Sequence, residues 1–156
     1  MPYAALDPDL HPLTNPSADT LRTVARELAP DGLLILDYRL DTLEPLPAFD
    51  RLRVLKIQTG FKLREIASLA SMTTLRELML STPTGSDGSG RVINIPSYAP
   101  LASLTALERL RLLGVRPADL DLSSIATMRQ LRELEIGGVK EFTLEQFARL
   151  AAALPN

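Results

Sequence analysis

A four-fold recurrence of the pattern L-x-x-L-x-(L/I) constrains the fold of this chain more than any other feature. These leucine frames are Leu52-Leu55-Ile57, Leu75-Leu78-Leu80, Leu107-Leu110-Leu112 and Leu131-Leu134-Ile136. Each frame is preceded by apolar residues six and three positions earlier: Leu46 and Phe49, Leu69 and Met72, Leu101 and Leu104, Ile125 and Met128. The frames start at 52, 75, 107 and 131, which are 23, 32 and 24 residues apart. Self-similarity at such intervals indicates a repeat architecture.

With the segment Leu63-Arg64-Glu65-Ile66 and its continuation to Leu75, the frames resemble the short bacterial leucine-rich repeats typified by internalins, over residues 31–142. The resemblance implies an α/β leucine-rich repeat solenoid: a curved parallel β-sheet of about five strands with an irregular or short-helical convex side. The chain departs from that family where an asparagine ladder should follow each strand. Those positions hold Gly60, Pro83, Val115 and Val139. We therefore expect a less regular coil, with Gly60, Gly114, Gly137 and Gly138 giving the turns conformational freedom.

A fifth, degenerate copy is predicted before the first frame. It falls in the run Leu33-Leu34-Ile35-Leu36, with Leu34 and Leu36 in the frame positions.

Both ends carry predicted helices that would cap the array, so residues 1–156 are expected to form a single domain. Residues 1–30 would hold an N-terminal arm and a cap helix over 16–29, with Asn15 as N-cap, Pro16 in the first turn, and an apolar face of Leu21, Val24, Ala25 and Leu28. The first fifteen residues would be either an extended arm on the first repeat or a disordered tail.

The C-terminal cap helix is expected over residues 143–156. Thr143-Leu144-Glu145-Gln146 has the pattern of a capping box. The predicted apolar face consists of Leu144, Phe147, Ala148, Ala151 and Leu154.

Composition narrows the class of protein. The net charge is −2 with basic residues spread along the chain, which gives no electrostatic footprint for nucleic acid. The absence of cysteine excludes disulfides, thiol catalysis and cysteine metal sites. No signal peptide or membrane-spanning run is recognisable, so we expect a cytoplasmic protein with no membrane partner, cofactor or metal.

Residues 81–91 form a polar, glycine-rich segment where the spacing between frames is longest. One interpretation is a loop that contacts a partner through Asp87 and Arg91, because insertions in repeat proteins often lie on the binding face. The other is a tolerated surface insertion. A phosphate cradle is disfavoured, since Gly85, Gly88 and Gly90 lack the Gly-Lys-Ser/Thr that would follow.

Side chains alternate along a strand, so the residues between the frame leucines should line the concave face of the sheet. Three columns across the strands follow: Leu33, Val54, Glu77, Arg109 and Glu133; Ile35, Lys56, Met79, Arg111 and Glu135; Asp37, Gln58, Ser81, Leu113 and Gly137. Arg109 would lie between Glu77 and Glu133, and Arg111 beside Glu135. These charges are either a stabilising ladder of exposed ion pairs or a recognition strip with Met79 and Leu113 as apolar anchors, and the two are compatible.

Catalytic residues are not predicted anywhere in the chain. The only histidine, His11, lies in the proline-rich arm, away from any candidate nucleophile. Asp119 and Asp121 alternate with leucines, as solvated residues of an extended segment do, and the pair Asp7 and Asp9 is weaker still.

These observations favour a non-enzymatic module that binds another protein on the concave face and the glycine-rich loop. A bacterial inhibitor or immunity-type protein, monomeric when unbound, is the particular form we expect, by analogy at the level of the fold. The alternative is a small enzyme with an unrecognised site at the glycine-rich loop. Self-association through an exposed sheet edge is a third possibility, which the predicted caps disfavour.

Overall fold

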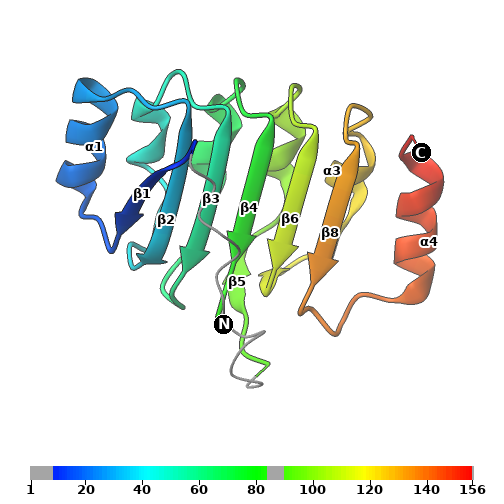
Figure 1. The fold of residues 1–156 in the computed structure, drawn as a ribbon. Helices are drawn as coiled ribbons and strands as arrows, with labels where there is room; N and C mark the ends of the chain where they lie inside the picture. The colour runs from blue at the N-terminus through cyan, green and yellow to red at the C-terminus, as the bar shows by residue number, and fades with distance from the viewer. Residues whose placement is uncertain (1–8, 84–89, 156) are drawn as a thin grey trace.

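A six-stranded parallel sheet forms the centre of the molecule (Figure 1). The structure is a computed structural model that describes residues 9–83 and 90–155. The strand order is β1-β2-β3-β4-β6-β8. The strands are β1 (His11–Thr14), β2 (Gly32–Tyr38), β3 (Val54–Thr59), β4 (Glu77–Ser81), β6 (Arg109–Leu113) and β8 (Glu133–Gly137).

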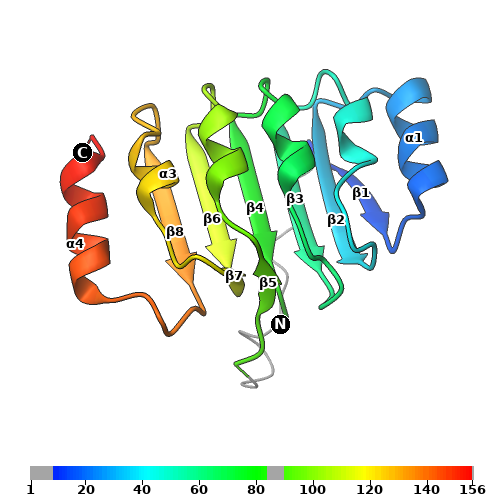
Figure 2. The same cartoon turned by 180° about the vertical axis from the view of Figure 1, so that it is seen from behind.

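Short helices cover one face of this sheet and leave the other open (Figures 1 and 2). They are the α-helices α1 (Ala18–Glu27), α3 (Ser123–Ala126) and α4 (Leu144–Ala153), and the 3₁₀ helices η1 (Leu46–Ala48), η2 (Ala67–Ser71) and η3 (Ala99–Ser103). A separate two-stranded parallel sheet pairs β5 (Ile93–Ile95) with β7 (Val115–Pro117). Within the described residues, no helix has the length and apolar character that a membrane span requires.

The leucine frames form the core between the sheet and the helices. The apolar positions of the frames and of the residues three and six places before them are buried, with two exceptions, Leu134 and Ile136 on β8. Each frame places two side chains of a strand on the covered face, because the pleat alternates sides. The frames therefore predict the core correctly up to the last strand.

The prediction of a leucine-rich repeat solenoid of about five strands is wrong. The described residues form an α/β fold with a mostly parallel six-stranded sheet and three α-helices. The sheet gains a strand because residues 11–14 of the arm pair with β2. The longest spacing contains β5, which pairs with β7 of the next crossover in a second sheet, so the unit does not repeat uniformly.

The phase of the degenerate copy is also corrected by one residue. Leu33 pairs with Leu55 and Ile35 with Ile57, and both Leu33 and Ile35 are fully buried. Leu34 is therefore on the open face, opposite Lys56. The spacing at this point is 55 − 33 = 22 residues, whereas the sequence prediction assumed 21. A shift of one residue exchanges the two faces of a strand.

The third outward column is wrong at Asp37. The register between β2 and β3 shifts between Ile35 and Tyr38, and Asp37 lies there with a φ of 54°. Tyr38 then pairs with Thr59, and Asp37 does not align with Gln58.

The N-terminal helix α1 has a different N-cap residue and a different buried face from those predicted. Ser17 is the N-cap of α1, and its hydroxyl accepts a hydrogen bond from the Thr20 amide at 3.1 Å. Asn15, the predicted cap, has a φ of 45° and lies in the turn after β1. Leu21 and Ala25 are buried as expected, but Leu28 is 58% exposed.

The N-terminal arm is anchored where it approaches β2. A Cβ atom on Gly32 would lie only 2.5 Å from Leu10 Cδ2 and 3.3 Å from the Asp9 carbonyl oxygen. Leu10 is 9% exposed, and the strand that follows it pairs with β2 from His11 to Thr14. Of the two alternatives for the arm, these residues therefore support the extended form.

The C-terminal helix keeps its predicted start. Thr143 and Gln146 form both hydrogen bonds of a capping box, at 3.1 and 3.0 Å. The predicted apolar face is right at Phe147 and Leu154, which pack against the core, and wrong at Leu144, which is 89% exposed; Leu150, absent from that prediction, is buried. The helix is thus turned relative to the expected face.

Two buried tyrosines bond to backbone carbonyls in the crossovers. The Tyr38 hydroxyl donates to the Thr42 carbonyl at 2.6 Å, and the Tyr98 hydroxyl donates to the Val115 carbonyl. Burial is the main cause that raises the pKa of both phenols above 10.0; Glu65, Asp41 and Glu44 add to the shift at Tyr38, and Asp119 adds to it at Tyr98. Both side chains are therefore held in the neutral form.

We expect stability to fall in alkaline solution. The folded-state pKa of each phenol lies above 10.0, so the stability is unchanged below pH 10.0 and declines above it, as tyrosine ionises only in the unfolded chain. The decline should be about 1.4 kcal/mol per pH unit for each buried tyrosine. Urea titrations at several pH values should show a shallower decline for Tyr98→Phe than for the parent. Equal slopes would contradict the assignment of this pH dependence to Tyr98.

Candidate binding face on the open side of the sheet

Charged residues from three neighbouring strands form a ladder across the open face. β4, β6 and β8 pair in register, which aligns Glu77, Arg109 and Glu133 in one row. The next row aligns Met79, Arg111 and Glu135. The frame leucines between them turn to the covered face, so the same pattern that builds the core sets these rows. The register predicted for these strands is confirmed.

The predicted ion pairs are present. Arg109 lies between two carboxylates, with Nη1 3.6 Å from Glu77 Oε2 and Nε 3.3 Å from Glu133 Oε1. Arg111 Nε is 3.0 Å from Glu135 Oε2. Both arginines and both β8 glutamates are more than half exposed, so each pair adds less than about 1 kcal/mol of stability.

One further pair extends the ladder to β3. Lys56 Nζ lies 3.2 Å from Glu77 Oε1, and both side chains are about three-quarters buried, at 25% and 22% exposure. The sequence columns missed this contact because they placed the two residues in different rows. The contact is diagonal, from Lys56 past its direct partner Met79. The signal was available, since a long lysine side chain reaches diagonal neighbours in a sheet.

The ladder borders a pocket of about 460 Å³ on the open face. The residues that line it are Glu77, Leu78, Arg109, Leu110, Arg111, Glu133, Leu134 and Glu135. Its walls carry both signs of charge, and the frame leucines contribute to its lining. The side chains of Leu78 and Leu110 are fully buried on the covered face, so what the pocket presents to a partner is mainly the charged side chains of both signs.

The remaining predicted residues of the face surround this pocket. Val54 and Gln58 lie on β3, Met79 and Ser81 on β4, and Leu113 on β6. All five are partly exposed. Leu113 lies beside its strand partner Gly137 on β8. A Cβ atom on Gly137 would lie 3.2 Å from Leu113 Cδ2.

Of the two predicted loop residues, Asp87 and Arg91, the structure describes one. Asp87 lies outside the described residues. Arg91 is a described residue and is exposed, with its Cζ 3.9 Å from the centre of the Phe61 ring. Such a cation–π contact anchors Arg91 to the segment after β3.

Asp119, Asp121 and His11 were considered for catalysis in the sequence, and the structure places them in a turn and on an edge strand. Asp121 accepts hydrogen bonds from the Ser123 amide at 2.8 Å and the Ser123 hydroxyl at 2.7 Å, and these bonds lower the pKa of its carboxyl group. Asp119 accepts from the Asp121 amide at 3.1 Å. Both carboxylates thus shape the turn before α3. His11 lies on the edge strand β1.

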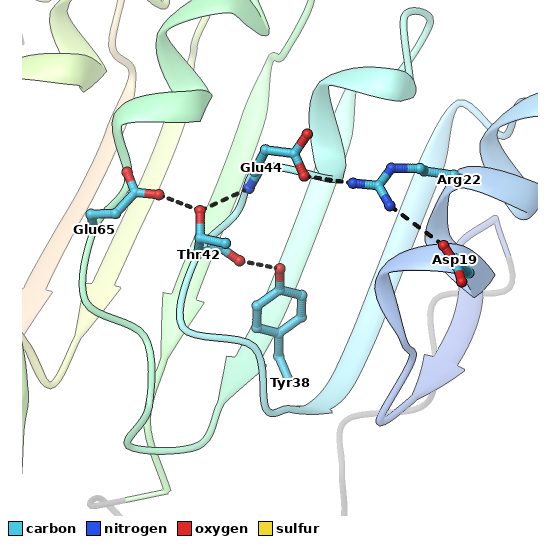
Figure 3. A network of polar contacts seen from close by, with 6 residues as sticks. All are labelled: Asp19, Arg22, Tyr38, Thr42, Glu44 and Glu65. Atoms are coloured by element: carbon cyan, nitrogen blue, oxygen red, sulfur yellow. Dashed lines mark hydrogen bonds and ion pairs between the residues drawn. The ribbon is translucent and has the colours of Figure 1, made fainter.

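A second polar cluster joins three consecutive crossovers behind the sheet (Figure 3). Arg22 on α1 binds Glu44 at 2.7 Å and Asp19 at 3.5 Å. The Thr42 hydroxyl bonds to Glu65, whose other carboxylate oxygen accepts from the Ala67 amide at 2.6 Å. The charged and polar groups of the cluster are paired with each other, and their hydrogen bonds and ion pairs connect the three crossovers. The cluster was not predicted, because the contacts that join its crossovers, Arg22 with Glu44 and Thr42 with Glu65, link residues 22 and 23 positions apart in the sequence.

Comparison with known proteins gives no family for this chain. No protein-family model matches it, and the search of curated proteins found no match. Nothing in these comparisons identifies a leucine-rich repeat family, and the class of protein rests on the fold alone: an α/β protein with a parallel sheet that is covered on one face.

Proposed function

We propose that the protein is a non-enzymatic binding module that holds a partner protein against the open face of its sheet. The observation that carries the proposal is the pocket between β4, β6 and β8, whose rim is the ladder of Glu77, Arg109, Arg111, Glu133 and Glu135. Charges of both signs held in fixed positions suit a protein surface, since charge complementarity sets register and excludes wrong partners.

The neighbouring apolar side chains supply the other part of a protein interface. Met79 directly precedes Arg111 in its row, and Leu113 stands at the end of β6. Both are partly exposed beside the charged ladder. Methionine, leucine and arginine together provide the apolar contact and the bidentate bonding that interface cores use.

Within this proposal, a cytoplasmic inhibitor or immunity-type protein of bacterial origin remains the particular form we favour. The support is compositional: an acidic chain without cysteine suits a reducing compartment and a basic partner. The proposed module is monomeric until the partner binds.

Reversal of the central charges should abolish partner binding. In the variant with Arg109→Glu and Arg111→Glu, five acidic side chains would meet on the pocket rim, and the frame leucines would be unchanged. We expect partner affinity to fall by more than about tenfold, because like charges replace complementary ones. The immobilised parent protein would first recover a stoichiometric partner from native lysate, and calorimetry would then compare the two proteins.

A matched control carries the same change in net charge elsewhere. Arg26 and Arg51 are 71% and 70% exposed and lie outside the open face, so Arg26→Glu with Arg51→Glu should bind like the parent. Circular dichroism melts of all three proteins establish that they fold. If the Arg109/Arg111 variant folds and binds as tightly as the parent, the ladder only stabilises the sheet and the proposal fails.

A further inference from the structure

The helix layer extends one position beyond the last strand of the sheet. In Figures 1 and 2, α4 stands outward from β8, next to α3. Between β8 and α4 lies a groove of about 450 Å³, lined mainly by Leu134 and Ile136 of the strand and Phe147, Leu150 and Leu154 of the helix. Apolar residues on both sides of this groove are therefore only partly covered.

The exposure of the two strand residues departs from the rest of the core. Leu134 and Ile136 are partly exposed, whereas Leu110 and Leu112, their partners on β6, are fully buried. The same frame positions are thus covered inside the sheet and open at its edge. In the part of the chain that the structure describes, β8 has no paired strand on its outer side.

The backbone of β8 is also free on that side. The Glu133 amide donates to the Glu108 carbonyl at 3.1 Å, and the Gly137 carbonyl accepts from the Gly114 amide at 2.8 Å. In a parallel ladder, alternate residues bond to the same neighbour, so the amides and carbonyls of Leu134 and Ile136 face away from β6. Within residues 9–83 and 90–155, no strand pairs with β8 on that side.

Among residues 9–83 and 90–155, the ion pairs of Glu133 and Glu135 all lie on the β6 side. Glu133 binds Arg109 at 3.3 Å, and Glu135 binds Arg111 at 3.0 Å, both across to β6. Their side chains remain 64% and 52% exposed. The series of ion pairs from Lys56 to Glu77, Arg109 and Glu133 alternates in sign, so a residue that continues it beyond Glu133 would be basic.

We propose that an extended segment of a partner protein adds to the sheet as a seventh strand beside β8, and that this segment alternates basic and apolar residues. Its basic residues would meet Glu133 and Glu135 on the open face. Its apolar residues would enter the groove between Leu134, Ile136 and α4. The inference does not require the open-face proposal to be correct, because it concerns the edge of the sheet.

The chain itself shows that such a sequence fits. β6 reads Arg109-Leu110-Arg111-Leu112 and already occupies the inner side of β8 with this alternation. A strand on the outer side meets the same row of side chains and should carry the same pattern. Added strands of this kind gain main-chain hydrogen bonds from the edge and specificity from alternate side chains.

A second copy of this chain is a poor occupant of the edge. Two β8 strands paired about a two-fold axis would place Glu135 opposite Glu135, and like charges directly opposite each other destabilise a sheet. The other edge strand, β1, carries Pro12, which has no amide hydrogen to donate, and no arginine or lysine.

Two capped, fluorescently labelled peptides test the proposal: Ser-Arg-Leu-Arg-Leu-Ser and Ser-Glu-Leu-Glu-Leu-Ser. We expect the basic peptide to bind the full chain at least about tenfold more tightly than the acidic one in anisotropy titrations. Amide exchange followed by NMR should slow at Leu134 and Ile136 when it binds. Exchange at Glu133 and Glu135, whose amides face β6, should change little.

Variants with altered charge distinguish binding of the peptide at the β8 edge from nonspecific electrostatic attraction to the protein. Glu133→Lys with Glu135→Lys should reverse the preference, so that the acidic peptide binds more tightly. If repulsion from Arg109 and Arg111 prevents that variant from folding, Glu133→Gln with Glu135→Gln should remove the preference instead. Glu145→Lys is the matched control, because Glu145 is 73% exposed on α4 and does not line the groove.

Three outcomes would overturn the proposal: binding of neither peptide, binding that persists in the Gln variant with unchanged exchange at Leu134 and Ile136, or a dimer in solution that protects these amides. The last would make a second copy the occupant of the edge. Loss of partner binding in the Arg109/Arg111 experiment is a separate result, since the peptide test needs no natural partner.

Discussion

Leu110→Ala should lower the free energy of unfolding by about 2 to 5 kcal/mol. Leu110 is 0% exposed in the centre of the sheet, and its direct partners are Leu78 on β4 and Leu134 on β8. Truncation would leave a cavity that the paired strands cannot close without breaking their register. Denaturant titration should show a lower midpoint with an unchanged slope.

Leu134→Ala provides the comparison, because it removes the same side chain from the same frame position at the partly exposed edge. We expect a loss of about 1 to 2 kcal/mol there, since less apolar area returns to water. A loss below about 1 kcal/mol for Leu110→Ala would mean that Leu110 is not in a close-packed core.

Gly138→Ala should destabilise the protein by about 2 to 4 kcal/mol. Gly138 has a φ of 77°, and a Cβ there would lie 3.0 Å from the Gly114 nitrogen and 3.1 Å from its Cα. The alanine would combine left-handed strain with a collision against backbone, which cannot rotate away. Thermal melts and urea titrations would measure the loss.

Gly90→Ala separates these two causes. Gly90 has a similar φ of 68°, but the nearest atom to its added Cβ is the flexible Lys140 Nζ at 3.7 Å. Its substitution should therefore cost only the left-handed strain, about 1 kcal/mol. Equal losses at both glycines would show that the close approach of Gly138 to Gly114 contributes nothing.

The sequence predicted the interior of the sheet because one short pattern defines both faces of each strand. Where Leu78 and Leu110 turn inward, Glu77 and Arg109 must turn outward, and parallel pairing then aligns them. The rows of charges could be read from spacing alone for this reason. The contact of Lys56 with Glu77 was missed because only direct partners were aligned, although a lysine can also reach a diagonal neighbour.

The ends of the chain could not be predicted in the same way. No frame marks β1, whose residues His11–Thr14 include a proline, yet they pair with β2. The phase error at Leu33 and Leu34 arose because a continuous apolar run fits both faces equally well. At the C-terminal end, Leu144 fits the apolar spacing of the helix, but it is 89% exposed. Its burial depends on how α4 packs against the rest of the fold, which the spacing does not specify.

The crossovers were predicted only in part. Gly114 and Gly138 have the positive φ angles that the missing asparagine ladder suggested, at 74° and 77°. Other carbonyl groups of the crossovers accept hydrogen bonds from side chains. Thr74 donates to the Leu52 carbonyl at 2.7 Å, Gln130 to Leu104 at 2.9 Å and Gln146 to Leu120 at 2.8 Å. These bonds from side chains to carbonyl groups could not be predicted from the sequence, because their donors do not recur at a regular spacing.

The open groove between β8 and α4 has a consequence for the motions of the molecule. Partial unfolding begins where the least apolar area is exposed by opening, and that place is the last strand and helix. α4 and β8 should detach together while β3 and β4 keep their pairing, so hydrogen exchange would be graded across the sheet. A strand bound at the edge would hold this end closed and raise the stability of the whole chain by mass action.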